Sequence, residues 1–120
     1  MFNIKTTELG NIMVAKEVVE TIAGLAAIDS YGLVGMVAQD ITSGLSSILG
    51  LESIRKGVQV SSSEAGLVVD VYIMVGYGIK IKEVAANVMQ KVVYDLDKHA
   101  GLKVATVNVN VKGVKVITEK

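Results

Sequence analysis

Hydrophobic residues recur at two different spacings along the chain, and the spacing separates expected helices from expected strands. They recur every three or four positions over residues 15–28, and the same period returns over residues 81–100. Because about 3.6 residues complete a helical turn, each segment presents one apolar face, and we expect a helix over each. The expected apolar faces are Val18, Ile22, Leu25 and Ala26 in the first helix and Val84, Val88, Val92 and Leu96 in the second.

Two glycines bear on these helices in different ways. Gly24 lies inside the first helix, where glycine costs roughly 1 kcal/mol relative to alanine. Several neighbours of Gly24 are alanine, so we expect another backbone to approach closely there. Gly101 follows Lys98 and His99, cations that suit the carboxyl end of a helix dipole. The second helix is therefore expected to stop at Gly101.

Alternation of apolar residues with others predicts strands elsewhere. Residues 58–60 alternate, and the β-branched run LVVDVYIMV covers residues 67–75. Two such runs on either side of a turn at residues 62–66 are typical of a β-hairpin. Further strands are expected at 104–111 and, as a short strand, at 11–14.

These elements place the chain in the α+β class. In the strand at 104–111 valines alternate with polar residues, so one side of the sheet should face water and the other should be covered by helices. We therefore expect a small, mostly antiparallel sheet with two main helices packed on one face, in the order β-α-(β)-β-β-α-β. A length of 120 residues fits one domain, to which we assign residues 1–120.

The pattern leaves two segments open. Residues 31–37, YGLVGMV, fit either a buried strand or an irregular segment. Residues 36–54 fit either a helix or a loop, because Gly44 and Gly50 interrupt an apolar stripe at helical spacing. The stripe would pack on the core or contact a partner. Its candidate interface residues are Ile41, Leu45, Ile48 and Leu49.

Composition narrows the functions that such a fold can carry. Twelve Lys and Arg balance twelve Asp and Glu, and this argues against nucleic-acid binding, which depends on uncompensated cations. The chain has no Cys and one His, which excludes thiol chemistry and thiolate metal sites and disfavours a His-based triad. We therefore expect no enzyme activity, no metal and no cofactor.

Hydropathy and charge favour self-association. Hydrophobic residues make up 51% of the chain, and its mean hydropathy of +0.51 is high for a soluble monomer of this size. A net charge of zero also removes the repulsion that keeps copies apart. No apolar run reaches the roughly 18 residues of a membrane span, and the start MFNIKTTELG lacks the layout of a signal peptide. We expect a cytoplasmic protein without direct membrane insertion.

The single histidine offers one candidate for chemistry. Asp95 and His99 are four positions apart, so they share a helix face and suit proton transfer. No motif places a Ser or Cys nucleophile beside them, and we favour a solvated pair at the helix end. Asp97 would point away from this face, so Asp95, Asp97 and His99 are not expected to bind a metal.

A glycine-containing turn offers a second candidate. Gly76 and Gly78 lie between a strand and a helix, with Lys80 and Lys82 just after them, and backbone amides at a helix start can hold an anion. The turn lacks the third Gly of a dinucleotide loop and the Gly-Lys-Ser/Thr of a P-loop. Turn geometry is the simpler interpretation, and anion binding is the alternative.

Residues Gly32 to Gly35 have the GxxG spacing of KH domains, which clamp a nucleic-acid backbone. The two central residues of such a loop are usually basic or polar, whereas here they are Leu33 and Val34. The chain also has only five aromatic residues on which bases could stack. We favour a packed turn over RNA binding.

Four blocks of sequence resemble the alkaline shock protein family, the envelope stress response proteins of Gram-positive bacteria. They follow one another in the family's order and span about residues 9–115. The blocks are VVETIAGLAAIDSYGLVG (Val18 to Gly35), Lys56-Gly57-Val58, VDVYIMVGYGIKIKEVAANVMQKV (Val69 to Val92) and GLKVATVNVNVKGV (Gly101 to Val114). The resemblance implies a small cytoplasmic α+β protein without established enzyme activity. It also implies a link to cell-envelope stress, through recruitment to the membrane by a partner or through self-assembly.

The polar side of the last expected strand is a further candidate interface. It comprises Thr106, Asn108, Asn110 and Lys112, and it is either solvated or a flat, nearly uncharged docking surface whose edge adds strands across chains. We expect a non-catalytic structural or adaptor protein that binds copies of itself or an envelope-linked partner, through which it would lie peripherally at the membrane. The alternative is a small-molecule or anion-binding regulatory module that uses the turn from Gly76 to Lys82.

Overall fold

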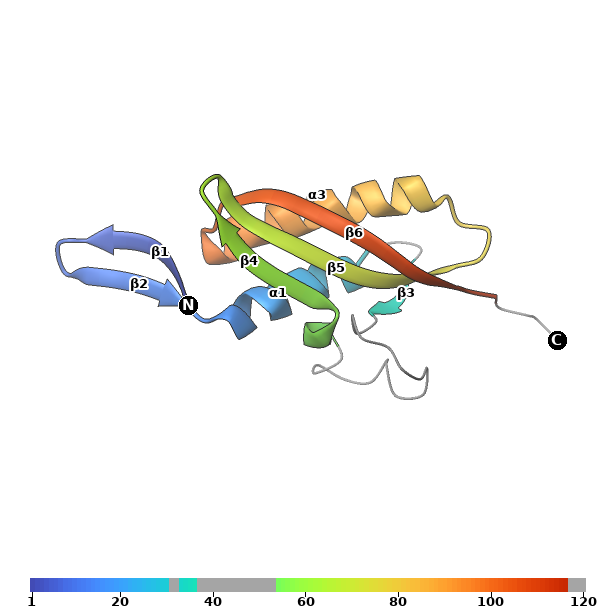
Figure 1. Cartoon of the computed structure of the whole chain (residues 1–120), viewed down its shortest axis with the longest axis horizontal. Helices are drawn as coiled ribbons and strands as arrows, with labels where there is room; N and C mark the ends of the chain where they lie inside the picture. Colours follow the sequence, from blue (N-terminus) through green and yellow to red (C-terminus); the bar gives the residue numbers. More distant parts are fainter. Residues whose placement is uncertain (31–32, 37–53, 117–120) are drawn as a thin grey trace.

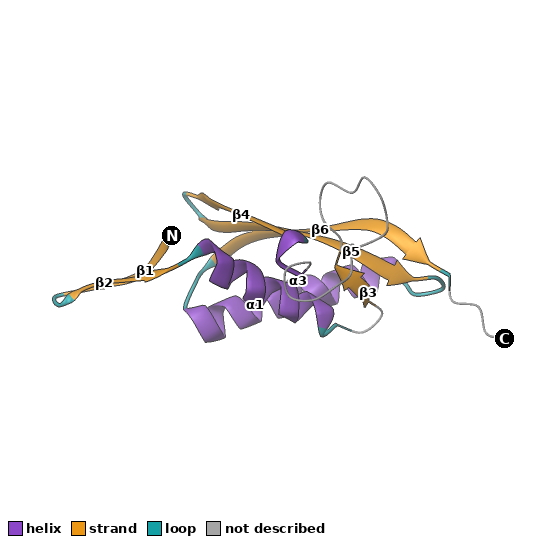
Figure 2. Cartoon of the chain, turned by 90° about the horizontal axis from the view of Figure 1, so that it is seen from below, coloured by secondary structure: helices purple, strands orange, loops and turns teal. Residues whose placement is uncertain are grey.

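The computed structural model describes residues 1–30, 33–36 and 54–116, which are arranged mainly in two layers (Figure 2). A β-sheet forms one layer, and helices α1 (Lys16–Ile28) and α3 (Ile81–Ala100) pack against one face of it. A separate hairpin of β1 (Phe2–Thr7) and β2 (Gly10–Val14) projects from one end (Figure 1). The expected α+β class, with two main helices on one face of the sheet, is confirmed.

Strand β5 (Gly66–Gly76) is the centre of the main sheet. Strands β4 (Val58–Ser63) and β3 (Leu33–Met36) pair antiparallel with successive parts of β5. Strand β6 (Val104–Lys115) pairs parallel with β5 along nearly its whole length. The parallel pairing follows from α3, because the chain crosses back over the sheet through this helix. Two of these three pairings are antiparallel, as expected.

Most of the predicted bounds agree with the structure. Helix α3 covers residues 81–100, and Gly101 caps it in the left-handed conformation with φ 66°. Helix α1 starts one residue later than expected, and β6 extends four residues beyond 111. The expected hairpin at 58–75 is formed by β4 and β5. Of the open segments, residues 33–36 form a strand, whereas 37–53 lie outside the described residues.

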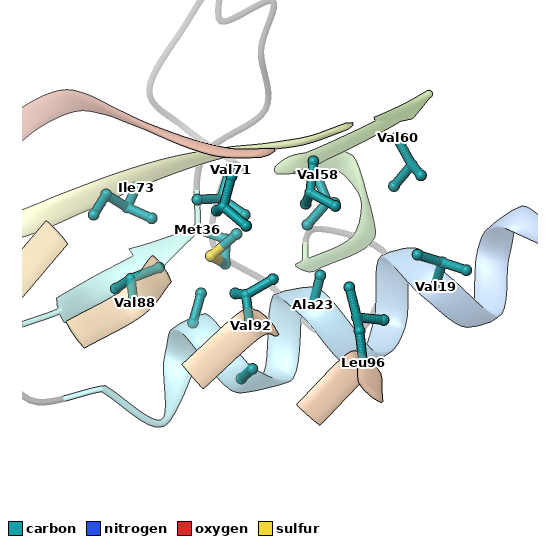
Figure 3. Close-up of a cluster of buried hydrophobic side chains, with 14 of the residues drawn as sticks. Val19, Ala23, Met36, Val58, Val60, Val71, Ile73, Val88, Val92 and Leu96 are labelled. Atoms are coloured by element: carbon teal, nitrogen blue, oxygen red, sulfur yellow. The ribbon is translucent and has the colours of Figure 1, made fainter. Parts of the chain in front are cut away.

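The core lies between the sheet and the two helices (Figure 3). Every second side chain of β5 points into it and is at most 5% exposed. The expected apolar face of α3 is confirmed, with its four side chains at most 3% exposed. Burying one such side chain contributes about 1.5–3 kcal/mol. The inward residues of these two elements are Leu67, Val69, Val71, Ile73, Val75, Val84, Val88, Val92 and Leu96.

The expected apolar face of α1 is confirmed at Ala26, which is buried, and at Ile22, which packs on the core, but it is wrong at Val18 and Leu25. Val18 and Leu25 are 46% and 47% exposed, whereas Val19 and Ala23 are fully buried. Small side chains face the sheet because the helix packs closely on its neighbours. The close approach expected at Gly24 is confirmed, since a Cβ there would lie 3.1 Å from the carbonyl oxygen of Ile54 and would collide with the Ile54 side chain.

The sequence pattern predicted only one of the two strands of the projecting hairpin, the strand at 11–14, and it did not indicate β1. Its first strand pairs antiparallel with β2 from Phe2 opposite Val14 to Thr7 opposite Gly10. Alternation of Phe2 and Ile4 with polar residues, followed by a turn that ends in Gly10, was the available signal. The expected order of elements therefore gains one strand at its start.

Candidate interaction surface on the open side of the sheet

The face of the main sheet opposite the helices is built from side chains that alternate with the core residues. Cross-strand register sets Gln59 of β4, Asp70 of β5 and Asn108 of β6 in one row. The neighbouring row holds Ser61, Val68 and Thr106. We call this surface the open face; its members are Gln59, Ser61, Val68, Asp70, Tyr72, Met74, Thr106, Asn108, Asn110 and Lys112.

Hydrogen bonds fix two of the amides on the open face. The Asn108 side-chain N–H donates to Asp70 Oδ1 at 2.8 Å, across the β5–β6 pair. The Asn110 side-chain N–H donates to the Val71 carbonyl oxygen at 3.3 Å, and Asn110 is half-buried. Such bonds hold the amides in place, so that a docking partner meets a preformed polar surface at little further cost in side-chain entropy.

Strand β6 forms an edge of the sheet. It pairs with β5 on one side, and none of the described strands pairs with its other side. The opposite edge of β5 is shared between β4 and β3. An unpaired strand edge presents a row of backbone donors and acceptors that can bind another strand. The open face and this edge therefore adjoin each other along β6.

The structure thus brings together one of the two expected groups of interface residues. Thr106, Asn108 and Lys112 are exposed on β6, with Asn110 between them. The other group, Ile41, Leu45, Ile48 and Leu49, lies outside the described residues. The sequence pattern missed the members contributed by β4 and β5, because only the cross-strand register shows that they adjoin β6.

Asp95 and His99 line a shallow depression of about 450 Å³ between α1 and α3. The charged partner of Asp95 there is Lys91, whose Nζ lies 3.3 Å from Asp95 Oδ2 and 3.7 Å from Asp29 Oδ2. Lys91 therefore links the end of α1 to α3, a structural role. Asp29 also lines the depression, and the remaining lining residues are apolar and come from α1: Ile22, Leu25, Ala26 and Ile28. Among the described residues, no serine, threonine or cysteine side chain lines this depression.

The turn between β5 and α3 contains the expected glycines. Gly78 has φ +91°, a backbone conformation that side chains with a Cβ rarely adopt, so turn geometry explains this glycine. The Tyr77 N–H donates to the Lys115 carbonyl oxygen at 2.9 Å and ties the turn to the end of β6. Lys80 and Lys82 are exposed, and α3 begins without a side-chain cap at Lys80. Anion binding by Gly76, Gly78, Lys80 and Lys82 stays a prediction.

The GxxG segment lies partly outside the described residues, which omit Gly32. Gly35 is buried within β3 and pairs with Met74 of β5, so the expected packed turn is a strand at this position. Among residues 1–30, 33–36 and 54–116, no three carboxylate or histidine side chains are grouped as metal ligands would be. In the same residues no helix is both long and apolar enough to cross a membrane.

The fold and these surfaces define a class: a small α+β protein with a sheet covered by helices on one face and, among the described residues, left uncovered on the other. Comparison with known families then identifies the family. The alkaline shock protein 23 family, described as having a cell envelope-related function, matches residues 4–116, and the chain belongs to it. The resemblance inferred from the four sequence blocks is thereby confirmed.

Relatives come from Gram-positive bacteria. The chain is 45% identical over 111 residues to the uncharacterized protein YloU of Bacillus subtilis, a match that covers 92% of each chain. It is 38% identical over 114 residues to an uncharacterized protein of Streptococcus pyogenes, covering 94% of each. It is 33% identical to the uncharacterized YqhY of Bacillus subtilis, covering 94% of this chain and 83% of YqhY. No solved structure matches the chain.

Proposed function

We propose that the protein is a non-catalytic structural or adaptor protein that acts near the cell envelope by binding copies of itself or an envelope-linked protein. The observation that carries this proposal is the open face beside the edge of β6 with which none of the described strands pairs. Hydrogen bonds hold two amide side chains of this surface in place, those of Asn108 and Asn110. Its one described histidine instead lies beside an ion-paired carboxylate in a shallow depression.

The low charge of the open face suits protein docking. Asp70 and Lys112 are its two charged members, and Asp70 accepts a hydrogen bond from Asn108. Removing ionised groups from water is costly, so a surface of amides, hydroxyls and partly exposed Val68, Tyr72 and Met74 is cheaper to bury. Because the net charge of the whole chain is zero, electrostatic repulsion between copies opposes association only weakly.

The family supports the setting of this proposal. Its described role is related to the cell envelope, which fits an adaptor that works in the cytoplasm and reaches the membrane through a partner. We propose this location together with the function. The apolar pattern in the sequence of residues 36–54 offers a second candidate interface under the same proposal.

Sedimentation velocity of the purified chain over micromolar concentrations tests self-association. The variant Asn108→Lys should raise the dissociation constant of the assembly by about tenfold, because it adds a cation and removes the hydrogen bond to Asp70. Asn87→Lys adds the same charge at an exposed position of α3 and should sediment like the parent chain. A strict monomer at every concentration, with no envelope protein co-purifying, would contradict the proposal.

A further inference from the structure

The free edge of β6 is uninterrupted over a short stretch. Its pairing with β5 shifts register at two places, with Ala105 and Lys112 as the extra residues. Bulges at an edge strand limit where another strand can pair. Between them runs Thr106–Val111, six residues in regular register that carry no charged side chain. This stretch is therefore the part of the edge that is suited to an additional strand.

Helix α3 carries an exposed stripe in addition to its buried face. Met89 and Val93 are 39% and 41% exposed, and with exposed Ala86 they lie at helical spacing. The stripe continues to Lys82 at one end and to Asp97 at the other, and both are exposed. Neither forms an ion pair within the described residues.

The exposed stripe lies on the side of α3 that borders the β6 edge. Lys91 marks the opposite side of the helix, because it reaches Asp29 at the end of α1. Met89 and Val93 are turned away from it by more than a quarter of the helix circumference. Helix α3 packs on β6, and the two run along the same long side of the molecule (Figure 1). The edge of β6 that no described strand covers and the stripe of α3 therefore lie on the same side of the molecule.

This surface is complementary to itself under a two-fold rotation. The stripe is centred between Met89 and Gln90, which is also the midpoint between Lys82 and Asp97. If two copies of α3 pack antiparallel about that midpoint, Lys82 of each copy meets Asp97 of the other. Opposite charges then face each other at both ends, and the apolar residues meet in the middle.

The same two-fold axis would also relate two antiparallel copies of β6. It would pass beside Val109, near the centre of the regular stretch, and set Asn108 of each copy opposite Asn110 of the other, so that side chains facing each other lie on the same side of the sheet. That point lies about 16 Å from the start of β6. The centre of the helix stripe lies about 16 Å from the end of α3 next to it. Packed helices lie about 8–10 Å apart, or two strand spacings, so in such a dimer each α3 axis would lie about one strand spacing from the two-fold axis.

We propose that two copies of the chain associate through this surface, with β6 pairing antiparallel to β6 and α3 packing on α3 between reciprocal Lys82–Asp97 contacts. The inference rests on the proposed self-association and names its surface and symmetry. It joins the two main sheets into one continuous sheet whose open faces lie on the same side. The partner that the observations favour is therefore a second copy of this chain.

Charge exchange tests the arrangement. Lys82→Glu and Asp97→Lys each place like charges at both ends of the stripe and should raise the dimer dissociation constant about tenfold in sedimentation. The double variant with both changes restores opposite charges and should recover most of the parent affinity. Lys98→Glu changes the same charge on α3, where Lys98 lies over the Tyr94 ring, and should leave the dimer unchanged.

Because the chain lacks cysteine, a single introduced thiol reports the two-fold axis directly. Met89→Cys should form a disulfide-linked dimer under mild oxidation, whereas Asn87→Cys, on another side of α3, should not. If the chain associates yet neither charge change weakens it and Met89→Cys does not cross-link, this interface is wrong while self-association stands. A chain that remains monomeric at all concentrations would overturn both.

Discussion

The projecting hairpin and the main sheet both alternate apolar and polar residues, yet their side chains have very different surroundings. On β5 every inward side chain is buried, whereas β2 has no buried residue. Ile12 and Met13 of β2 are 49% and 48% exposed, and Leu9 in the turn is fully exposed. Only the base of the hairpin packs on the core, through Phe2, Ile4 and Val14.

The difference shows that alternation makes a strand but not a core. Helices cover one face of the main sheet, and no described helix covers the hairpin (Figure 2). Side-chain hydrogen bonds help to fix the hairpin instead, among them Thr6 Oγ1 to Asn11 Oδ1 at 2.8 Å and Asn3 Nδ2 to Thr6 Oγ1 at 3.0 Å. Exposed bonds of this kind contribute about 1 kcal/mol or less each. The two regions should therefore respond very differently to matched substitutions.

The largest contrast is expected for a leucine in each region. Leu96 of α3 is fully buried against the sheet, so Leu96→Ala should lower the free energy of unfolding by about 2–5 kcal/mol. Leu9→Ala, in the exposed turn, should change it by less than about 0.5 kcal/mol. Urea denaturation followed by circular dichroism measures both values. Equal losses would show that the hairpin turn is covered in solution.

A pair of glycines sharpens the comparison. Gly66 and Gly10 have nearly the same conformation, with φ +139° and +142°. A Cβ at Gly66 would lie 2.8 Å from the Lys103 carbonyl oxygen, whereas a Cβ at Gly10 meets nothing within 4 Å. Gly66→Ala should cost about 2–3 kcal/mol and Gly10→Ala about 1 kcal/mol, the latter from backbone strain alone. Thermal unfolding gives the difference, and equal costs would mean that the crowding at Gly66 is relieved.

The smallest effect concerns a carboxylate. Burial raises the pKa of Glu20 on α1, with Glu17 adding to the rise and Lys16 and Arg55 opposing it. A raised pKa means that the native state binds this proton more tightly than the unfolded state does. The contribution of Glu20 to the free energy of unfolding is therefore fully present below the pKa of Glu20 in the unfolded state. It is lost as the pH rises through the pKa of Glu20 in the folded state.

Glu20→Gln removes this dependence. Its stability relative to the parent should rise between pH 4 and pH 7, by less than about 1 kcal/mol. Urea midpoints at both pH values measure the change. Glu8→Gln, a matched change in the exposed hairpin turn, provides the control. A relative stability of Glu20→Gln that fell with rising pH would contradict the assigned direction.

Strongly periodic segments could be predicted from the sequence, and weakly periodic ones could not. The bounds of α3 and the inward residues of β5 follow directly from spacing, because one stripe of large side chains dominates each. The face of α1 was wrong in part because Ala23 and Ala27 are buried for their small size, which a hydrophobicity pattern does not weigh. Four of the ten residues of the open face, those on β6, were identified from alternation. Its neighbours on β4 and β5 depend on register.

The sequence by itself determined the periods of its elements, the glycine stop after α3, and a composition poor in groups for chemistry. These are local properties, set by the spacing and kind of side chains along one segment. Tertiary structure alone decided that β6 lies at an edge of the described sheet and that α3 packs on it. Whether a strand is an edge depends on which distant segments pair with its neighbour, and no local spacing records that choice.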